Sequence, residues 1–304
     1  MTVLEADDRR PVAEVLPALP SRHRLWWRVL RTLMRRRKEH DDVPPLSVEV
    51  PALHIDPHRL QAYRAVCGIE HAILPVTYPQ VQAAALQMHL LTRPEFPLPL
   101  LGVLHVRNTI RLFQPLDPAK AYRVRVGVQS GTTVPSGIEF PMVARYYDGE
   151  TLVWEAVATG LCRTRRRGSG AKRPSAAEEV EQYEACATFD VPSDIGRRYG
   201  RVSGDRNPIH LWPLGGRLFG YPSHIAHGMW CLARCLVLLH QEAPPPPVEI
   251  QMELRQPLFL PARVTLWRVQ RADTLDFILT TSDHARLHLR GSIRPAFSGT
   301  LTHD

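Results

Sequence analysis

The sequence predicts an α+β fold made of two copies of one unit. Three observations support this: an internal repeat, one helix-like segment followed by strand-like segments in each half, and a composition that favours strands and turns. When the two halves are aligned, the first set of matching positions is Tyr63, Val66 and Gly68 with Tyr199, Val202 and Gly204. The second is Phe113-Gln-Pro-Leu116 with Arg255-Gln-Pro-Leu258. Repetition on the scale of a domain indicates a duplicated unit.

The elements follow the same order in both halves. In the first half, a helix is expected at 79–92, starting at Pro79 and ending before Pro94, and strands are expected at 102–114, 121–130, 138–147 and 151–163. In the second half, a helix is expected at 228–241 and strands at 248–256, 262–271, 274–281 and 285–294. Residues 122–128 alternate apolar and polar side chains as a half-buried strand does. Proline makes up 28 of 304 residues, well above average usage, which favours turns and connections over a helical bundle.

The chain divides into four parts in this prediction. Residues 1–45 form a basic amphipathic extension, 46–164 the first copy, 165–182 a linker and 183–304 the second copy. The linker assignment follows from its Gly, Ser and basic composition. The length of 304 residues suits two domains of ordinary size.

Two short blocks in the second copy contain the candidate chemistry. Within 199–210, Asp205, Asn207 and His210 bring an acid, an amide and an imidazole together, and Gly204 and Pro208 interrupt any continuous helix there. The second block, 220–229, directly precedes an apolar run. Gly228 there is a candidate backbone donor at the start of a helix, where N–H groups lack intrahelical acceptors. The structural alternative is that an Asp before Asn-Pro forms an Asx turn and that the single His is structural.

The string Ser-Gly-Asp-x-Asn-Pro-Ile-His, followed by Ile-Ala-His-Gly-Met, resembles the signature of the MaoC-like (R)-specific enoyl-CoA hydratases, also called hydratase 2. The resemblance implies a double hotdog, in which two antiparallel sheets each wrap one long central helix. It also implies a role for eight residues: Asp205 and His210 as the catalytic pair, Asn207 as an orienting residue, Gly228 as donor to the thioester carbonyl, and Ser203, Gly204, Ala226 and His227 in substrate binding. Gly216 stands where the family usually has Ala or Ser, which predicts weaker packing at that point.

The first copy lacks the acid and the base. In the alignment of the halves, Ile69 falls on Asp205, His71 on Asn207 and Leu74 on His210. The first copy is therefore expected to be a degenerate hotdog whose helix, with its small residues Ala83, Ala84 and Ala85, borders the acyl chain.

Hydration of an enoyl thioester needs a base for the water, an acid for C2 and a donor for the enolate oxygen. The residues above supply all three without a metal or a cofactor. The expected activity is (R)-specific hydration of trans-2-enoyl thioesters, or the reverse dehydration of (R)-3-hydroxyacyl thioesters. The alternative is a non-catalytic acyl-thioester-binding or scaffold protein. The expected partner is an acyl-CoA or acyl carrier protein thioester, and the expected state is a monomer or homodimer.

A basic segment at 22–38 stands apart from the two copies. Its apolar positions share one helical face: Leu25, Trp26, Val29, Leu30, Leu33 and Met34. Three interpretations fit this pattern: a helix packed on the body or a second subunit, a helix on an anionic membrane surface, and a docking helix for an acidic carrier protein.

The remaining composition narrows the partners and the location. The formal net charge of +8 does not indicate nucleic acid, because no nucleic-acid motif accompanies it. Five cysteines without framework spacing indicate reduced thiols. No signal peptide and no apolar run of about 20 residues are found, so a cytoplasmic protein is expected, with peripheral contact at the inner face of the membrane under the membrane interpretation.

Overall fold

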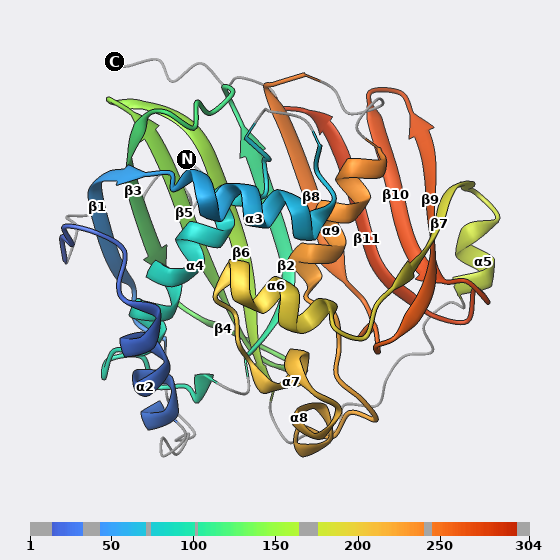
Figure 1. Cartoon of the computed structure of the whole chain (residues 1–304), viewed down its shortest axis with the longest axis horizontal. Helices are drawn as coiled ribbons and strands as arrows, with labels where there is room; N and C mark the ends of the chain where they lie inside the picture. The colour runs from blue at the N-terminus through green and yellow to red at the C-terminus, as the bar shows by residue number, and fades with distance from the viewer. Residues whose placement is uncertain are drawn as a thin grey trace.

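The computed structural model describes residues 14–32, 43–70, 74–100, 103–163, 176–239 and 245–296. These residues form one 11-stranded antiparallel sheet (Figure 1). Its strands are β1 (Leu46–His54), β2 (Val103–Leu112), β3 (Ala121–Val128), β4 (Thr132–Val134), β5 (Gly137–Asp148), β6 (Thr151–Arg163), β7 (Glu184–Val191), β8 (Val248–Leu254), β9 (Ala262–Arg271), β10 (Thr274–Thr281) and β11 (Leu287–Pro295).

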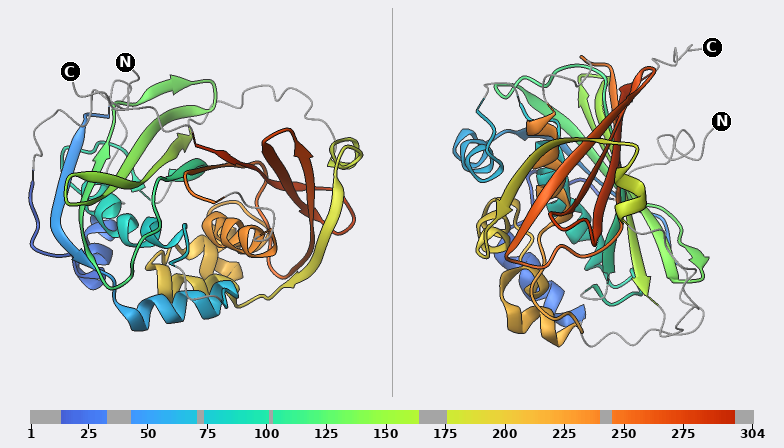
Figure 2. Two further views of the ribbon diagram at one scale, coloured as in Figure 1. Left: turned by 90° about the horizontal axis from the view of Figure 1, so that it is seen from above. Right: turned by 90° about the vertical axis from the view of Figure 1, so that its right-hand side faces the viewer.

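The sheet curves around two long helices. The described helices are α2 (Arg22–Thr32), α3 (Pro57–Cys67), α4 (Tyr78–Leu91), α5 (Ala176–Val180), α6 (Ile195–Ser203), α7 (Pro208–Leu211), α8 (Pro213–Leu218) and α9 (Gly228–Leu238). Seen from above, the strands form an arc with α4 and α9 on its inner side, and α3 and α6 cover the open side of the arc (Figure 2). The apolar core fills the space between the arc and these helices.

The two halves of the sheet repeat one topology. From the edge inward, the first half runs β1-β3-β5-β6-β2 and the second runs β7-β9-β10-β11-β8. In each half an edge strand, a helix over the open side of the arc (α3 or α6), a central helix (α4 or α9) and four further strands follow in chain order. Among the described strands, β4 is the one addition. The halves join where β2 pairs with β8, with Asn108 opposite Met252. This is the double hotdog fold that the sequence predicts.

The positions that aligned the two halves have equivalent places in the structure. Gly68 ends α3 and Gly204 ends α6, both in the left-handed conformation, with φ of 70° and 84°. Glycine adopts this conformation without steric cost, which explains its recurrence at a helix C-terminus. The rings of Tyr63 and Tyr199 lie 6.1 Å apart between their centroids. α3 and α6 therefore end in the same way, but only α6 leads into the candidate acid and base.

Three strands were absent from the sequence prediction: β1, β7 and the three-residue β4. The first two are edge strands that pair on one side only within the path of the sheet. Pro51 interrupts the pattern of β1, and most of β7 is exposed or half-buried. A clear apolar alternation needs one consistently buried face, which β7 lacks and which Pro51 interrupts in β1. The predicted helix at 228–241 ends earlier, at Leu238, and residues 240–244 lie outside the described part of the chain.

The helix of the N-terminal extension packs on the body of the protein. Leu25 and Val29 of α2 are 5% and 1% exposed, whereas Trp27 is 60% exposed. Arg28 Nη1 donates a hydrogen bond to Nδ1 of His89 on α4, over 3.1 Å. This packing supports the first of the three interpretations and removes Leu25 and Val29 from any membrane contact. The side chains of Trp26 and Leu30 and residues 33–38 lie outside the described part, as does most of the predicted linker.

None of the described helices is both long and apolar enough to span a membrane.

Candidate active site

The end of α6 places the candidate acid. Because Gly204 terminates the helix, Asp205 begins a short loop, and its N–H donates to Ser203 Oγ over 3.2 Å. Asp205 Oδ1 accepts the Asn207 N–H over 3.1 Å. This is the Asx turn of the structural alternative, but it uses only one carboxylate oxygen. The other, Oδ2, faces the pocket described below, so the same residue forms the turn and presents a free acceptor.

A one-turn helix, α7, places the candidate base. Asn207 Oδ1 accepts the Ile209 N–H over 3.3 Å, and Pro208 takes the first helical position. Three residues after this cap, Nδ1 of His210 lies 2.9 Å from the carbonyl oxygen of Ile225. A carbonyl oxygen can only accept, so Nδ1 bears the hydrogen and Nε2 has a free lone pair. Asn207 thus orients His210 through the helix that it caps.

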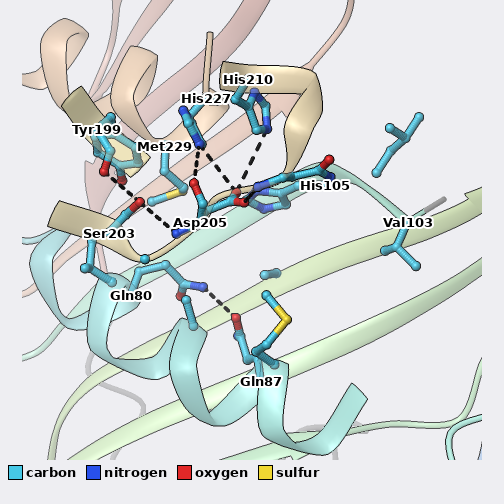
Figure 3. A pocket seen from close by; sticks show the side chains of 18 of the residues that line it. Gln80, Gln87, Val103, His105, Tyr199, Ser203, Asp205, His210, His227 and Met229 are labelled. Atoms are coloured by element: carbon cyan, nitrogen blue, oxygen red, sulfur yellow. Dashed lines mark hydrogen bonds and ion pairs between the residues drawn. The ribbon is translucent and has the colours of Figure 1, made fainter. Parts of the chain in front are cut away.

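Acid and base face each other across a short gap (Figure 3). Asp205 Oδ2 lies 3.9 Å from His210 Nε2. This separation exceeds a direct hydrogen bond, and one water molecule can bridge the two atoms. The Asp205 side chain is 43% exposed and that of His210 is 12% exposed, so the carboxylate remains accessible while the imidazole is held in place.

His227, at the N-cap position of α9, closes the other side of the acid. Its Nε2–H donates to the backbone oxygen of Asp205 over 3.1 Å, and Nε2 lies 3.7 Å from Asp205 Oδ2. Its ring is stacked on His210 and also contacts Tyr199. Burial, reinforced by His210, lowers the pKa of His227 to about 3. His227 is therefore neutral near pH 7 and holds the Asp205 loop by hydrogen bonding.

The protonation states of the pair suit proton transfer from water. Burial lowers the pKa of His210 below its ordinary value, and the Asp205 carboxylate opposes this only in part, so the imidazole is neutral near pH 7. Burial alone would raise the pKa of Asp205, but His227, His210 and the Asn207 N–H together lower it. The pair therefore presents a carboxylate and a neutral imidazole, as a general base requires.

Gly228 occupies the first position of α9, and its N–H has no hydrogen-bond acceptor among the described residues. The N-terminus of this 11-residue helix also supplies a partial positive charge. A Cβ at this position would lie 2.4 Å from Cδ1 of Leu254. Glycine is thus required where the first turn of α9 packs on β8. Gly228 lines the same pocket as Asp205 and His210.

All eight residues that the sequence singled out line one pocket of about 430 Å³. These are Ser203, Gly204, Asp205, Asn207, His210, Ala226, His227 and Gly228. Both halves of the protein contribute to its walls. Ala84 and Ala85 of α4 line it, whereas Ala83 points into the core, and Leu25 and Val29 of α2 complete the lining.

Sequence reasoning missed several pocket residues from the first half. His105 on β2 lies beside Asp205 in Figure 3, and its Nε2–H donates to the Arg107 carbonyl over 2.9 Å. Gln80 and Gln87 of α4 also line the pocket. No motif marked these positions, because the first copy has lost the acid and base that made the second copy recognisable.

Three pocket side chains have the spacing of a metal site. One atom each from Asp205, His210 and His227 lies within 4.8 Å of the others. The Nε2 of His227 bears the hydrogen that it donates to the Asp205 carbonyl, so its lone pair is not available for a metal in this state. The arrangement suits a bound water between acid and base.

Glycines allow the close packing behind the site. A Cβ on Gly196 would lie 1.8 Å from the His210 carbonyl oxygen, and one on Gly200 would lie 2.8 Å from that of Asp205. Gly216, expected to weaken local packing, is itself tightly packed, because a Cβ there would lie 2.2 Å from the Ser223 carbonyl oxygen. That expectation was wrong: the missing methyl group admits a neighbouring backbone.

Similarity to known proteins identifies the family of this chain. The family model described as "MaoC like domain" matches residues 173–266, which include both motif blocks. The 3-hydroxyacyl-thioester dehydratase X of Mycobacterium tuberculosis is 30% identical over 255 residues, covering 84% of this chain and 91% of that protein. The chain belongs to the MaoC-like dehydratase family.

Two solved structures agree with the fold. A crystal structure of HtdX from Mycobacterium tuberculosis matches with a TM-score of 0.72 and 30% identity, over 82% of this chain and 99% of that chain. A MaoC-like dehydratase from Phytophthora capsici matches with a TM-score of 0.61 over 83% of this chain and 95% of that chain. At 16% identity the latter similarity concerns the fold alone.

Proposed function

We propose that this MaoC-like dehydratase interconverts trans-2-enoyl thioesters and (R)-3-hydroxyacyl thioesters. One observation supports this most directly. Asp205 Oδ2, the free lone pair of His210 and the unpaired Gly228 N–H line the same pocket. In the proposed reaction His210 is the base, Asp205 orients the water and Gly228 is the oxyanion donor. The similarity to a 3-hydroxyacyl-thioester dehydratase supports the same substrate class.

In the hydration direction, one water bridges Asp205 and His210. His210 Nε2 takes a proton from this water while the Asp205 carboxylate fixes its orientation. The water oxygen bonds to C3 of the enoyl group, and negative charge moves to the thioester oxygen. The Gly228 N–H donates to that oxygen, and the positive end of α9 adds to the stabilisation.

The proton then returns from the same pair to C2, which completes the hydration. Because water and proton both arrive from the side of Asp205 and His210, the addition is syn. The dehydration follows the same path in reverse: the pair removes the C2 proton and returns it to the leaving hydroxyl.

The test is an assay of the purified protein with crotonyl-CoA and a long-chain enoyl-CoA, following the absorbance of the enoyl thioester. Asp205→Asn and His210→Ala should each lower kcat by about 10²–10⁴-fold while the melting temperature changes little. Chiral analysis of the product should give the (R)-alcohol. Near-normal turnover by the double variant, or an (S)-product, would contradict the assignment.

A non-catalytic acyl-binding or scaffold protein is the second candidate. It is favoured only by the first half, where Ile69 and Leu74 replace the acid and base. It predicts binding of acyl-CoA without turnover in the same assay. The carrier, coenzyme A or an acyl carrier protein, follows from comparing KM for the two thioesters of one acyl chain.

A further inference from the structure

The central helix of the first half buries more polar side chains than a core helix needs. Gln80, Gln82, Gln87 and His89 of α4 are each less than a tenth exposed. Two of them have protein partners. Gln82 Nε2 donates to the His54 carbonyl over 3.3 Å, and its Oε1 accepts from the Tyr146 hydroxyl over 3.4 Å. His89 bonds to Arg28 and Glu14 through its two ring nitrogens.

Gln80 and Gln87 are only half satisfied. Gln80 Nε2 donates to Gln87 Oε1 over 3.1 Å, as Figure 3 shows. The other two amide atoms, Gln80 Oε1 and Gln87 Nε2, are buried and have no partner among the described residues. Exchanging oxygen and nitrogen in both amides leaves the same result. In either orientation the pair leaves one acceptor and one donor unused.

Such a pair is unfavourable without a further hydrogen-bond partner. Buried amide atoms are nearly always hydrogen-bonded, and an unpaired one lowers stability. Gln80 and Gln87 are only 5% and 6% exposed. Both line the candidate catalytic pocket. A bound molecule that both donates and accepts a hydrogen bond would satisfy the two atoms together. A hydroxyl group does so with a single oxygen.

We propose that Gln80 and Gln87 form a polar subsite that binds a hydroxyl group on the acyl chain of the thioester substrate. This rests on the proposed function, because it assigns part of that substrate. It restricts the substrate class to acyl chains that bear an oxygen beyond the reacting carbons.

The position of the pair favours the acyl chain over the carrier arm. Gln80 lies near Ser203 at the catalytic end, and Gln87 lies two turns further along α4 (Figure 3). Further along α4 the lining of the pocket is apolar. It consists there of Met88 and Leu91 of α4 and Leu25 and Val29 of α2. The carrier arm must instead reach solvent. The amides of a pantetheine arm offer the same hydrogen-bonding chemistry, and the experiment separates these two sources.

The test is a titration calorimetry series with saturated thioesters, which cannot be hydrated. The probes are decanoyl-CoA and its hydroxydecanoyl-CoA isomers with the hydroxyl placed beyond C3. One isomer should bind wild-type protein about three- to tenfold more tightly than decanoyl-CoA for each hydrogen bond gained. Gln80→Leu and Gln87→Leu should abolish this preference and bind decanoyl-CoA at least as well as the wild type.

Gln82→Leu is the matched control, because Gln82 is on the same helix but is already bonded to His54 and Tyr146. It should lower the melting temperature and keep the preference. The Gln80→Leu/Gln87→Leu protein should melt at the wild-type temperature or above, since it loses two unpaired buried atoms. A large fall in melting temperature with the preference intact would show that the pair is structural and overturn the proposal.

Two further outcomes separate the possible errors. If the glutamine variants weaken plain and hydroxylated chains equally, the pair binds the carrier arm and the acyl-chain subsite is wrong. If wild-type protein hydrates crotonyl-CoA but prefers no hydroxylated isomer, the subsite alone is wrong. If one isomer is preferred in a glutamine-dependent way but no enoyl thioester is hydrated, the subsite stands and the catalytic assignment fails.

Discussion

The imidazole rings of His210 and His227 are stacked, with centroids 3.8 Å apart and planes inclined by 25°. Two histidines so close cannot both be charged without strong repulsion. Burial lowers the pKa of both rings, so both are neutral near pH 7, and each donates its one N–H to a different carbonyl oxygen. His210 donates from Nδ1 to Ile225, and His227 donates from Nε2 to Asp205. Only His210 therefore has an Nε2 lone pair directed toward the carboxylate.

The pH dependence of the reaction should reflect this environment. His210 acts as a base only when neutral, so activity is lost as the pH falls through its pKa. Burial lowers that pKa below 6.5, and the Asp205 carboxylate offsets part of the effect. We expect kcat/KM for crotonyl-CoA to stay constant from pH 8 to about 6.5 and to fall only at more acidic pH. An acidic limb centred above 6.5 would be inconsistent with a buried neutral base.

Gly228→Ala should reduce activity through packing. The new Cβ would lie 2.4 Å from Cδ1 of Leu254, so the first turn of α9 or the leucine must move. Displacement of the N–H should lower kcat by up to about 10²–10³-fold, the cost of one oxyanion donor. Adding Leu254→Ala should restore much of the lost rate. Gly149→Ala is the control: the site has open space around it but a φ of 60°, so the substitution should lower the melting temperature and leave kcat unchanged. If the second substitution restores nothing, the steric explanation is wrong.

Enlarging the small residues of α4 should shorten the preferred acyl chain. Ala84 and Ala85 line the pocket, and Ala83, 0% exposed, faces the core. Ala84→Leu should lower kcat/KM for a long-chain enoyl-CoA at least tenfold and retain turnover of crotonyl-CoA. Ala83→Leu should lower the melting temperature by overpacking, a cost of about 1–3 kcal/mol, without changing the preference. Equal loss of all substrates in Ala84→Leu would mean that this face is core and not tunnel.

Deletion of residues 1–40 should destabilise the protein, because it removes the buried Leu25 and Val29 of α2. We expect the melting temperature to fall by several degrees and long-chain turnover to suffer more than crotonyl-CoA turnover. A matched pair of substitutions refines the test: Leu25→Ser should reproduce part of the loss, and Trp27→Ser, at an exposed site, should not.

The membrane interpretation of this segment makes the opposite prediction. Liposome co-sedimentation that is salt-sensitive and disappears on deletion, with an unchanged melting temperature, would favour an interfacial helix over a packed one.

The candidate catalytic motif could be recognised because its residues are close in sequence. Asp205, Asn207 and His210 lie on one loop and one helical turn, and Gly228 begins the next long helix. The order of the central helix and the four strands that follow it in each half was predictable for a related reason: the inner strands are buried enough to show clear apolar patterns. These features depend on local sequence. The pairing order of the strands in the sheet was not predicted.

The features that the sequence did not predict depend on tertiary contact. Gly196 and Gly200 are unfavourable residues for a helix. They are needed because the backbone of the segment with Asp205 and His210 packs directly against them. Gln80 and Gln87 read as ordinary polar residues of a surface helix, although both are buried at the pocket. Only the joining of the two halves brings these side chains to the acid and base of the other copy.

The pairing of β2 with β8 also affects how this protein can diversify. In an assembly of two identical chains, each substitution appears in both subunits, so one helix would have to serve as both catalytic and substrate-facing helix. Here the two units are joined in one chain and one sheet, with Asn108 opposite Met252 at the seam. α9 can therefore keep Gly228 for chemistry while α4 changes its pocket residues independently. Selectivity for the acyl chain can then vary in one half without altering the reaction centre in the other.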